Sequence, residues 1–504
     1  MKYTAKPVKV SLVHAPWETV ECVTLVIPLF EEDKPDTPFA KRLNERLRGL
    51  LGELVSTSEW KATFGQEVTV YRPGQCRAAR LVLIGAGKQA AYDAAASRTL
   101  AMLATYRAKD RKPGLLAILG RTNGIPTGLF VQGTTEGVIL GNHRIDEYKT
   151  ENQSKSLAGE ASLVLEEITP SSDLEVALAR GHVIAQAANR ARSLVNEPGN
   201  TINPAVLAER ALEMASKSGL QVQVFDEAEM ERQGMKAILA VGQGSEHPPR
   251  FIVLRHAGAP SADDPPIVFV GKGVTFDSGG LSLKPAESMA DMKSDKAGAC
   301  AVMAAMRAIA ELEVPLNVVG LIPAAENLPG GRAQRPGDVI HSMSGKTIEV
   351  LNTDAEGRLL LADALHYGRT LNPRFILDLA TLTGAIVVAL GSFRAGLFCN
   401  NEELYGRVTE AARVSGERLW RMPLDDDYRK ELDSQIADIK NVGSRSGGAI
   451  TAAKFLEEFV DKQPWCHLDM AGVDNFPENE EIKGPTGFGT RTLVELALQS
   501  AGER

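Results

Sequence analysis

Acidic and basic side chains gather in three short segments of the sequence, where together they could hold metal ions. Four are carboxylates and three are basic: Asp277, Asp295, Asp354 and Glu356, with Lys272, Lys284 and Arg358. The carboxylates carry a charge of about −4, which two divalent cations would neutralise. Sites rich in carboxylates, without thiolates or imidazoles, suit Mg, Mn or Zn acting in pairs. The residue types therefore predict metal-assisted hydrolysis.

Each segment also has a purely structural explanation. Residues 277–280 read Asp-Ser-Gly-Gly, which is typical of a turn, and Lys272 could extend its ammonium to water. Asp295 could cap the helix that follows it. Asp354 and Glu356 could form a solvated acidic turn, although two residues apart in extended chain they can point the same way. A common site is favoured because all three segments lie at predicted strand-to-helix junctions of one sheet.

An α/β framework must position these segments. In the first third of the chain the apolar pattern predicts helices at 39–55 and 93–108, between strands at 8–13, 22–30, 67–71, 80–84 and 115–119. Farther on it predicts buried strands at 251–254, 267–270, 317–322, 348–351, 375–379 and 386–390. Helices are expected at 204–217, 296–312, 358–367, 402–415, 449–460 and 490–499. In such sheets the site lies at the carboxyl ends of the strands.

The order of these elements predicts an α/β protein with two domains. We expect a smaller N-terminal α/β domain over residues 1–170, with a role in assembly or access to the site. A connecting helix is expected at 171–195, because the chain turns polar before it and Ser172 or Asp173 can cap it. Residues 196–504 would form the larger C-terminal catalytic domain, with a central mixed sheet flanked by helices.

The composition is that of an ordinary globular protein and excludes fibrous, collagen-like and broadly disordered classes. Of the 504 residues, 44% are hydrophobic and 24% are charged, and the formal net charge of −8 gives no general attraction to nucleic acid or anionic membranes. We find no signal peptide and no apolar stretch long enough to span a bilayer. The sequence predicts a cytoplasmic protein without a membrane segment.

The cysteines are odd in number and far apart, and none forms a C-x-x-C pair: Cys22, Cys76, Cys300, Cys399 and Cys466. This pattern indicates reduced, scattered thiols, not a disulfide framework or a thiolate zinc site. The sequence also lacks the H-E-x-x-H and G-x-S-x-G signatures. Residues 85–88 resemble the start of a phosphate loop, but they lack its full pattern and favour a plain strand and turn.

At the segments named above, the chain resembles the cytosol (leucyl) aminopeptidase family, whose dinuclear metallo-exopeptidases include bacterial aminopeptidase A. The strongest match is the family's signature octapeptide, Asn-Thr-Asp-Ala-Glu-Gly-Arg-Leu, intact at 352–359. Residues 271–280, 284–285, 292–295 and 379–384 also match in order and spacing, and weaker matches include 467–472. The resemblance covers the chain from about residue 196 onward, and over the first 170 residues it rests only on the order of strands and helices.

The resemblance implies a metal-dependent hydrolase that removes N-terminal residues, leucine-like ones preferred, from peptides with a free N-terminus. It assigns one metal ion, Mn or Zn, to Asp277, Asp354 and Glu356. It assigns a second to Lys272, Asp277, Asp295 and Glu356, so that two carboxylates bridge. Lys272 could bind a metal only as a neutral amine, and a neighbouring dication lowers the pKa of a lysine.

The resemblance also implies a mechanism and an assembly. A water or hydroxide bridging the metals would attack the first peptide carbonyl, Lys284 would help to hold the resulting oxyanion, and Arg358 would bind a bicarbonate that serves as general base. The chain would assemble as a homohexamer.

Two positions depart from the family pattern. Lys296 stands where methionine is usual, and we expect the added positive charge beside the metals to shift metal affinity or the pKa of the bound water. Asp474 stands where some members place an apolar residue of the side-chain pocket. Its carboxylate could favour basic N-terminal residues, or it could be a rim residue that faces water.

Two other functions share some of these features. A non-catalytic scaffold or DNA-binding role would not require four carboxylates to be held close together, which is energetically unfavourable. The net charge of −8 gives no support to DNA binding. Phosphoryl chemistry at a two-metal site would use the same carboxylates, but the glycine loop at 85–88 is a poor phosphate cradle. The sequence therefore favours an aminopeptidase.

Overall fold

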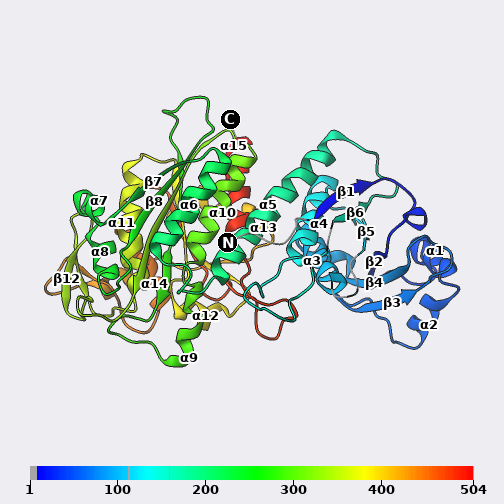
Figure 1. Ribbon diagram of the computed structural model, residues 1–504, viewed down its shortest axis with the longest axis horizontal. Coiled ribbons are helices and arrows are strands. Elements are labelled where there is room, and N and C mark those ends of the chain that lie inside the picture. The colour runs from blue at the N-terminus through cyan, green and yellow to red at the C-terminus, as the bar shows by residue number, and fades with distance from the viewer. Residues whose placement is uncertain (1–7, 110, 112–113, 158, 503–504) are drawn as a thin grey trace. The chain divides into compact units, whose positions relative to one another are not determined.

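The computed structural model describes residues 8–109, 111, 114–157 and 159–502. The chain forms two compact units, Met1–Gln186 and Ala187–Arg504, each built from helices and strands (Figure 1). The division between them falls within helix α5 (Ser172–Asn196), at the place where the sequence predicts a helix. The expected two-part α/β architecture is confirmed.

The first unit is a six-stranded sheet with helices on both faces. The strands, in the order β1-β6-β5-β2-β4-β3, are parallel except for β3, which pairs antiparallel with β4. They are β1 (Lys9–Val13), β2 (Thr24–Phe30), β3 (Glu67–Tyr71), β4 (Arg80–Gly87), β5 (Leu116–Leu119) and β6 (Glu160–Val164). The helices are α1 (Pro38–Arg46), α2 (Leu50–Ser56), α3 (Ala94–Lys109) and α4 (Thr127–Gly141).

Three features of this unit differ from the sequence prediction, and one of them is strand β6, which was not predicted. The single helix expected at 39–55 is divided, because Gly49 has a φ of 91° and starts a new turn. Helix α4 was not predicted, since glycines and threonines weaken its helical pattern. Its glycines have a packing role, because a Cβ on Gly137 or Gly141 would collide with the backbone of α3 at Arg98 or Met102.

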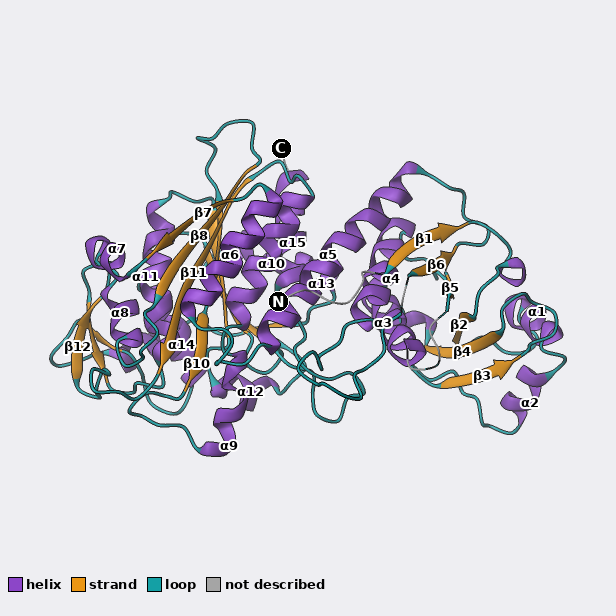
Figure 2. Ribbon diagram, viewed as in Figure 1, coloured by secondary structure: helices purple, strands orange, loops and turns teal. Residues whose placement is uncertain are grey.

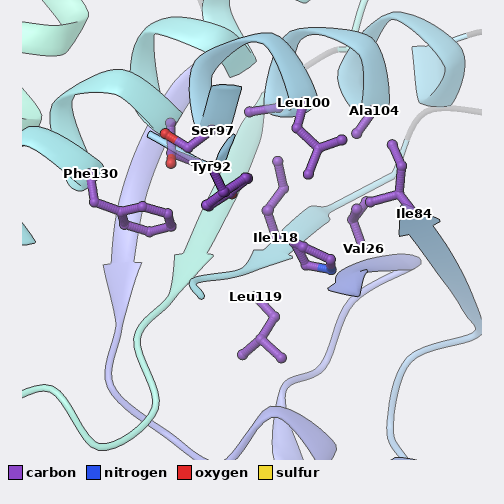
Figure 3. A pocket seen from close by; sticks show the side chains of 12 residues that line it. Val26, Ile84, Tyr92, Ser97, Leu100, Ala104, Ile118, Leu119 and Phe130 are labelled. Atoms are coloured by element: carbon purple, nitrogen blue, oxygen red, sulfur yellow. The ribbon is translucent and has the colours of Figure 1, made fainter. Parts of the chain in front are cut away.

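A small cavity lies between the sheet of this unit and helices α3 and α4. Figure 3 shows Tyr92 and Phe130 beside it, with Leu100 and Ile118 among the other side chains that line it. The cavity has room for about one water molecule, and its walls are mostly apolar. It is therefore a packing feature of the core, too small for a peptide.

The second unit contains a nine-stranded mixed sheet. Eight strands follow the order β16-β15-β18-β14-β9-β11-β8-β7, and β10 pairs with β11. The central strands β18, β14, β9 and β11 run parallel, so their carboxyl ends meet at one edge. The strands are β7 (Gln221–Phe225), β8 (Arg250–Ala257), β9 (Ile267–Gly271), β10 (Gly273–Asp277), β11 (Asn317–Asn327), β14 (Phe375–Ala380), β15 (Ala395–Cys399), β16 (Leu419–Arg421) and β18 (Trp465–Asp469).

Helices cover both faces of this sheet (Figure 2). The face of Gly320 in β11 packs on α10 through Val302 and Met306, and the next residue, Leu321, points to the opposite face and contacts α11 at Gly368. The helices are α6 (Pro204–Ser218), α7 (Glu227–Gln233), α8 (Lys236–Gly242), α9 (Ala286–Met289), α10 (Ala297–Glu311), α11 (Glu356–Thr370), α12 (Gly384–Leu390), α13 (Glu402–Ser415), α14 (Gly448–Glu457) and α15 (Thr490–Gly502).

One strand prediction was wrong in this unit, and a second strand was predicted correctly but assigned to the wrong sheet. Residues 386–390 form most of α12 and not a buried strand, because the Thr383 side chain accepts from the Ile386 amide and caps a helix there. The strand expected at 348–351 is β13 (Thr347–Val350), but it does not join the main sheet. It belongs to a separate three-stranded sheet with β12 (Asp338–His341) and β17 (Ile439–Lys440).

The expectation that all cysteines are reduced thiols was also wrong. Cys399 and Cys466 form a disulfide, although 67 residues separate them. They are directly opposite each other on the antiparallel strands β15 and β18, with Cα atoms 4.2 Å apart. Cys22, Cys76 and Cys300 are free thiols.

Across the described part of the chain, none of the helices combines the length and the apolar character needed to span a membrane.

Candidate metal centre

The carboxyl edge of the central strands brings Lys272 and Asp277 into the interior of the second unit. β9 ends at Gly271, Lys272 follows it, and Asp277 is the last residue of β10. Gly271 is required here, because a Cβ would collide with the backbone of Gly298 at the start of α10. Lys272 is only 3% exposed and Asp277 only 2% exposed, so neither reaches bulk water as the turn interpretation assumed.

Asp354 and Glu356 reach the same place from the turn between β13 and α11. Glu356 opens α11, where the positive end of the helix dipole favours a carboxylate. The chain is not extended between Asp354 and Glu356, so the two side chains do not point the same way for the reason expected from the sequence. Each of Asp277, Asp354 and Glu356 nevertheless places an oxygen within 4.8 Å of the others.

Asp295 joins the cluster through Lys272. The ammonium of Lys272 lies 2.7 Å from Oδ1 of Asp295 and 2.9 Å from Oε1 of Glu356. Thr381 Oγ1 donates to the same Oδ1 of Asp295 at 2.7 Å. The helix-cap interpretation of Asp295 was wrong, because α10 begins at Ala297 and no side chain caps it.

Lys284 connects the remaining two acids. Its ammonium lies 2.8 Å from Oδ2 of Asp277 and 2.6 Å from Oδ1 of Asp354. The side chain is 16% exposed, whereas that of Lys272 is 3% exposed. Lys284 is therefore the ammonium of this cluster that a molecule entering from solvent can contact.

Arg358 lies in the first turn of α11 and is buried. One guanidinium NH group donates to the carbonyl of Asn441 at 2.8 Å, while Nε has no hydrogen-bond partner among the described residues. Burial lowers the pKa of Arg358 to about 10, against the opposing attraction of Glu356 and Asp469. Arg358 therefore keeps its positive charge at neutral pH.

Burial and mutual repulsion make full ionisation of the acids in this cluster unfavourable unless positive charge lies beside them. Burial raises the pKa of Asp295, Glu356 and Asp354, and repulsion from the neighbouring carboxylates raises it further. Burial alone would lower the pKa of Lys272 and Lys284, but attraction to the same carboxylates outweighs it and raises both. In the absence of metal ions, the two lysines therefore stay protonated and neutralise part of the acidic charge.

The donor set fits divalent cations. Oε2 of Glu356 and Oδ2 of Asp295 are buried and have no hydrogen-bond partner in the described parts of the chain. Leaving a carboxylate oxygen buried and unpaired is costly, and a cation would satisfy it. Four carboxylates and one amine, without thiolate or imidazole, are donors that suit Mg, Mn or Zn.

Two polar residues at the ends of central strands were not singled out as functional from the sequence. Asn327, the last residue of β11, donates to Oδ1 of Asp277 at 2.8 Å and to the carbonyl of Thr353 at 3.0 Å. Asp469, the last residue of β18, accepts from Thr383 Oγ1 at 2.6 Å and from the Leu382 amide at 3.1 Å. A polar residue at the end of a buried strand was the signal that could have found both.

Lys296 does not point at the carboxylates. It is fully buried, and its ammonium donates to the carbonyls of Val195, Glu197 and Lys293 at 3.2, 2.8 and 2.5 Å. Burial lowers its pKa to about 8. Backbone carbonyls hold the ammonium, and the effect of its charge on the metals stays a prediction.

Asp474 is 8% exposed, so the interpretation as a rim residue facing water was wrong. Burial raises its pKa to about 6, against hydrogen bonds from Ser294 and Asn475. Asn475 Nδ2 lies 2.7 Å from Oδ2 of Asp474. Its contact with Ser294 places Asp474 near Asp295, while its role in a side-chain pocket stays a prediction.

Comparison with known proteins gives concordant matches over nearly the whole chain. Residues 189–494 match the family model described as the cytosol aminopeptidase family, catalytic domain, and residues 26–152 match the N-terminal domain of the same family. A probable cytosol aminopeptidase of Solibacter usitatus is 44% identical over 494 residues, covering 97% of this chain and 99% of the relative. One of Roseiflexus castenholzii is 45% identical over 478 residues, covering 94% and 95%.

Solved structures agree with these sequence matches. A mutant of tomato leucine aminopeptidase superposes with a TM-score of 0.89 at 34% identity, covering 99% of this chain and 98% of that one. The bottromycin maturation enzyme BotP in complex with Mn superposes with a TM-score of 0.81 at 35% identity, covering 95% and 99%.

Proposed function

The chain belongs to the cytosol aminopeptidase family and is a metal-dependent aminopeptidase, and from this premise we propose that its acidic cluster is the catalytic metal centre. One metal would be held by Asp277, Asp354 and Glu356, and the other by Lys272, Asp277, Asp295 and Glu356. The observation that carries this proposal is the convergence of three carboxylates within 4.8 Å, next to buried oxygens of Asp295 and Glu356 that have no hydrogen-bond partner in the described structure.

We propose Mn or Zn as the metals, and the similarity to an enzyme solved in complex with Mn favours Mn. When bound, two such cations supply an activated water and a Lewis acid for the peptide carbonyl. Lys272 must lose a proton to become a ligand, and its present partners Asp295 and Glu356 are the proposed ligands that would draw a cation to it.

Two further side chains complete the proposed mechanism. Lys284, the more exposed lysine, would donate to the oxyanion that develops on the substrate carbonyl. Arg358 would hold a bicarbonate as general base, since its charged guanidinium is buried and its Nε has no partner in the described part of the chain. The substrates would be peptides with a free N-terminus and a leucine-like first residue, which the similarity to a leucine aminopeptidase supports.

We also propose that residues 1–170 serve assembly or access to the site. A helix at 171–195 would connect them to the peptidase domain at 196–504, and the protein would work in the cytoplasm.

A homohexamer is the proposed assembly. Exposed apolar side chains in and after α12, with Val388 90% and Phe393 65% exposed, provide a surface for such contacts. Light scattering during gel filtration would test the assembly, and a monomeric mass would contradict it.

The proposed centre is tested by hydrolysis of a leucine anilide after chelation, with and without added Mn²⁺ or Zn²⁺. We expect activity to return with metal in the wild type and to stay absent in Asp354→Ala. Asp461→Ala is the matched control, because Asp461 pairs with Arg369 on the surface. Restored activity in Asp354→Ala, or hydrolysis by wild type that chelation does not affect, would contradict the proposal.

A further inference from the structure

Lys296 forms a hydrogen-bond network that the catalytic proposal does not use. Its side chain is fully buried, and its three N–H donors match three backbone carbonyls, those of Val195, Glu197 and Lys293. A lysine buried in this way is immobilised, because every direction of its ammonium is occupied by an acceptor.

These acceptors belong to two separate segments of the second unit. Val195 is the next-to-last residue of α5, and Glu197 follows the helix end, where carbonyls lack helical partners and carry partial negative charge. Lys293 lies in the short 3₁₀ segment Ala290–Ser294 that leads to Asp295. The ammonium of Lys293 also binds the end of α5, because it lies 3.2 Å from both the carbonyl and Oδ1 of Asn196.

Asp295 lies between Lys293 and Lys296, the two lysines whose side chains bind the end of α5. Unlike Asp277, it is not carried by a strand, since it lies between the 3₁₀ segment and the first residue of α10. Lys296 follows Asp295 directly in the chain. The hydrogen bonds of the Lys296 side chain therefore restrict the position of the Asp295 backbone. Thr381 and Lys272 orient Oδ1 of Asp295, while Oδ2 has no hydrogen-bond partner in the described structure.

We propose that Lys296 is a positioning residue that holds Asp295 in place for the second metal ion by fastening its segment to the end of α5. This inference rests on the proposed metal centre. The ammonium acts through its hydrogen bonds to carbonyls, not through a charge presented to the metals. The two explanations predict opposite effects of removing it. Loss of a nearby positive charge would tighten metal binding. Loss of the hydrogen bonds between Lys296 and the end of α5 would weaken metal binding.

The test is Lys296→Met, which keeps most of the length of the unbranched side chain and removes its donors. Chelator-treated wild type and variant are titrated with Mn²⁺, and free Mn²⁺ is followed by electron paramagnetic resonance. We expect two sites in both proteins, with one of them about 10-fold weaker in the variant, as is typical when a supporting residue behind a ligand is lost. Lys454→Met is the matched control, because Lys454 is also buried but donates to Asp426 and Glu457.

Unchanged or tighter binding in Lys296→Met would overturn the inference while leaving the metal centre intact. A wild type that binds no pair of Mn²⁺ ions would overturn the metal centre and this inference with it. If Lys296→Met fails to fold by circular dichroism, Lys293→Met gives the same test, because it removes the two contacts to Asn196 from the same segment. One weaker site supports the inference there too, and two unchanged sites overturn it.

Discussion

The side-chain amide of Asn327 donates a 2.8 Å hydrogen bond to Oδ1 of Asp277, across 50 residues of sequence. The second contact of this amide, at 3.0 Å, is to the carbonyl of Thr353, the residue before Asp354. One side chain at the end of β11 therefore orients one proposed ligand and fixes the turn that carries another. Such partners of metal ligands set the direction of the ligand oxygen and its basicity.

Replacement of Asn327 by alanine should weaken metal binding about 10- to 100-fold, because Asp277 would lose the bond that orients it. Mn²⁺ titration of the chelated protein measures this. Asn317→Ala is the matched control, since Asn317 begins the same strand and donates to backbone carbonyls of a surface loop. Equal effects of the two substitutions would show that Asn327 acts only on general stability.

Lys284→Met should lower kcat by roughly 10²- to 10³-fold and leave two metal sites, because it removes a donor to the oxyanion and no proposed ligand. Leucine anilide kinetics at saturating Mn²⁺ measure the loss. Lys346→Met, which removes a surface pair with Glu458, serves as the control. A kcat within 2-fold of wild type would exclude this role of Lys284.

Metal removal should destabilise the folded protein, because the carboxylates of the cluster would then repel one another with only lysines between them. Each cation present at a hundred times its dissociation constant stabilises the fold by roughly 2.7 kcal/mol. Urea unfolding with chelator or with Mn²⁺ measures the difference. The difference should shrink in Glu356→Gln, and an unchanged difference would place the stabilising metal elsewhere.

The stability contributed by Asp474 should fall as pH rises from about 4 to about 6. Burial raises the folded-state pKa to about 6 from an ordinary value of 3.8, so in this window the folded state retains a proton that the unfolded state has lost. Asp474→Asn should therefore gain stability relative to wild type between pH 4 and pH 7, measured by urea unfolding. A constant difference would show that the Asp474 carboxyl is not shifted.

The same ionisation tests the proposed side-chain pocket. Above about pH 6 a charged Asp474 would attract a basic N-terminal residue, so the ratio of arginyl to leucyl kcat/KM should rise between pH 5 and pH 7. The ratio should stay flat in Asp474→Asn. A strong leucyl preference that is independent of pH in the wild type would remove Asp474 from the pocket.

The disulfide between Cys399 and Cys466 gives a count of thiols that differs from the sequence expectation. Denatured protein should show three reactive thiols without reductant and five with it. A disulfide that joins residues 67 positions apart restricts the unfolded chain and should stabilise the fold by about 4 kcal/mol. Cys399→Ala should therefore unfold at a lower urea concentration than the wild type. Five thiols without reductant would show that the pair is reduced in solution.

The sequence by itself determined the residue types of the proposed centre and most of the elements that carry them. Apolar runs such as β9 and β14 are buried on both faces, so their pattern is strong enough to be recognised locally. The octapeptide at 352–359 indicated the chemistry through its resemblance to the signature of the cytosol aminopeptidase family, because the residue types and their spacing alone also suit a solvated acidic turn. The prediction failed for α12, whose short apolar run suits a strand or a helix equally well.

Only the tertiary structure decided which side chains meet. Lys272 lies between Asp295 and Glu356, Cys399 faces Cys466, and Lys296 turns toward the end of α5. These contacts join segments that lie far apart in the chain, and they depend on the order and register of strands. Hydrophobic periodicity fixes which face of an element is buried, but it does not specify which element covers that face. The partners of a buried charge are therefore decided only when the sheet is assembled.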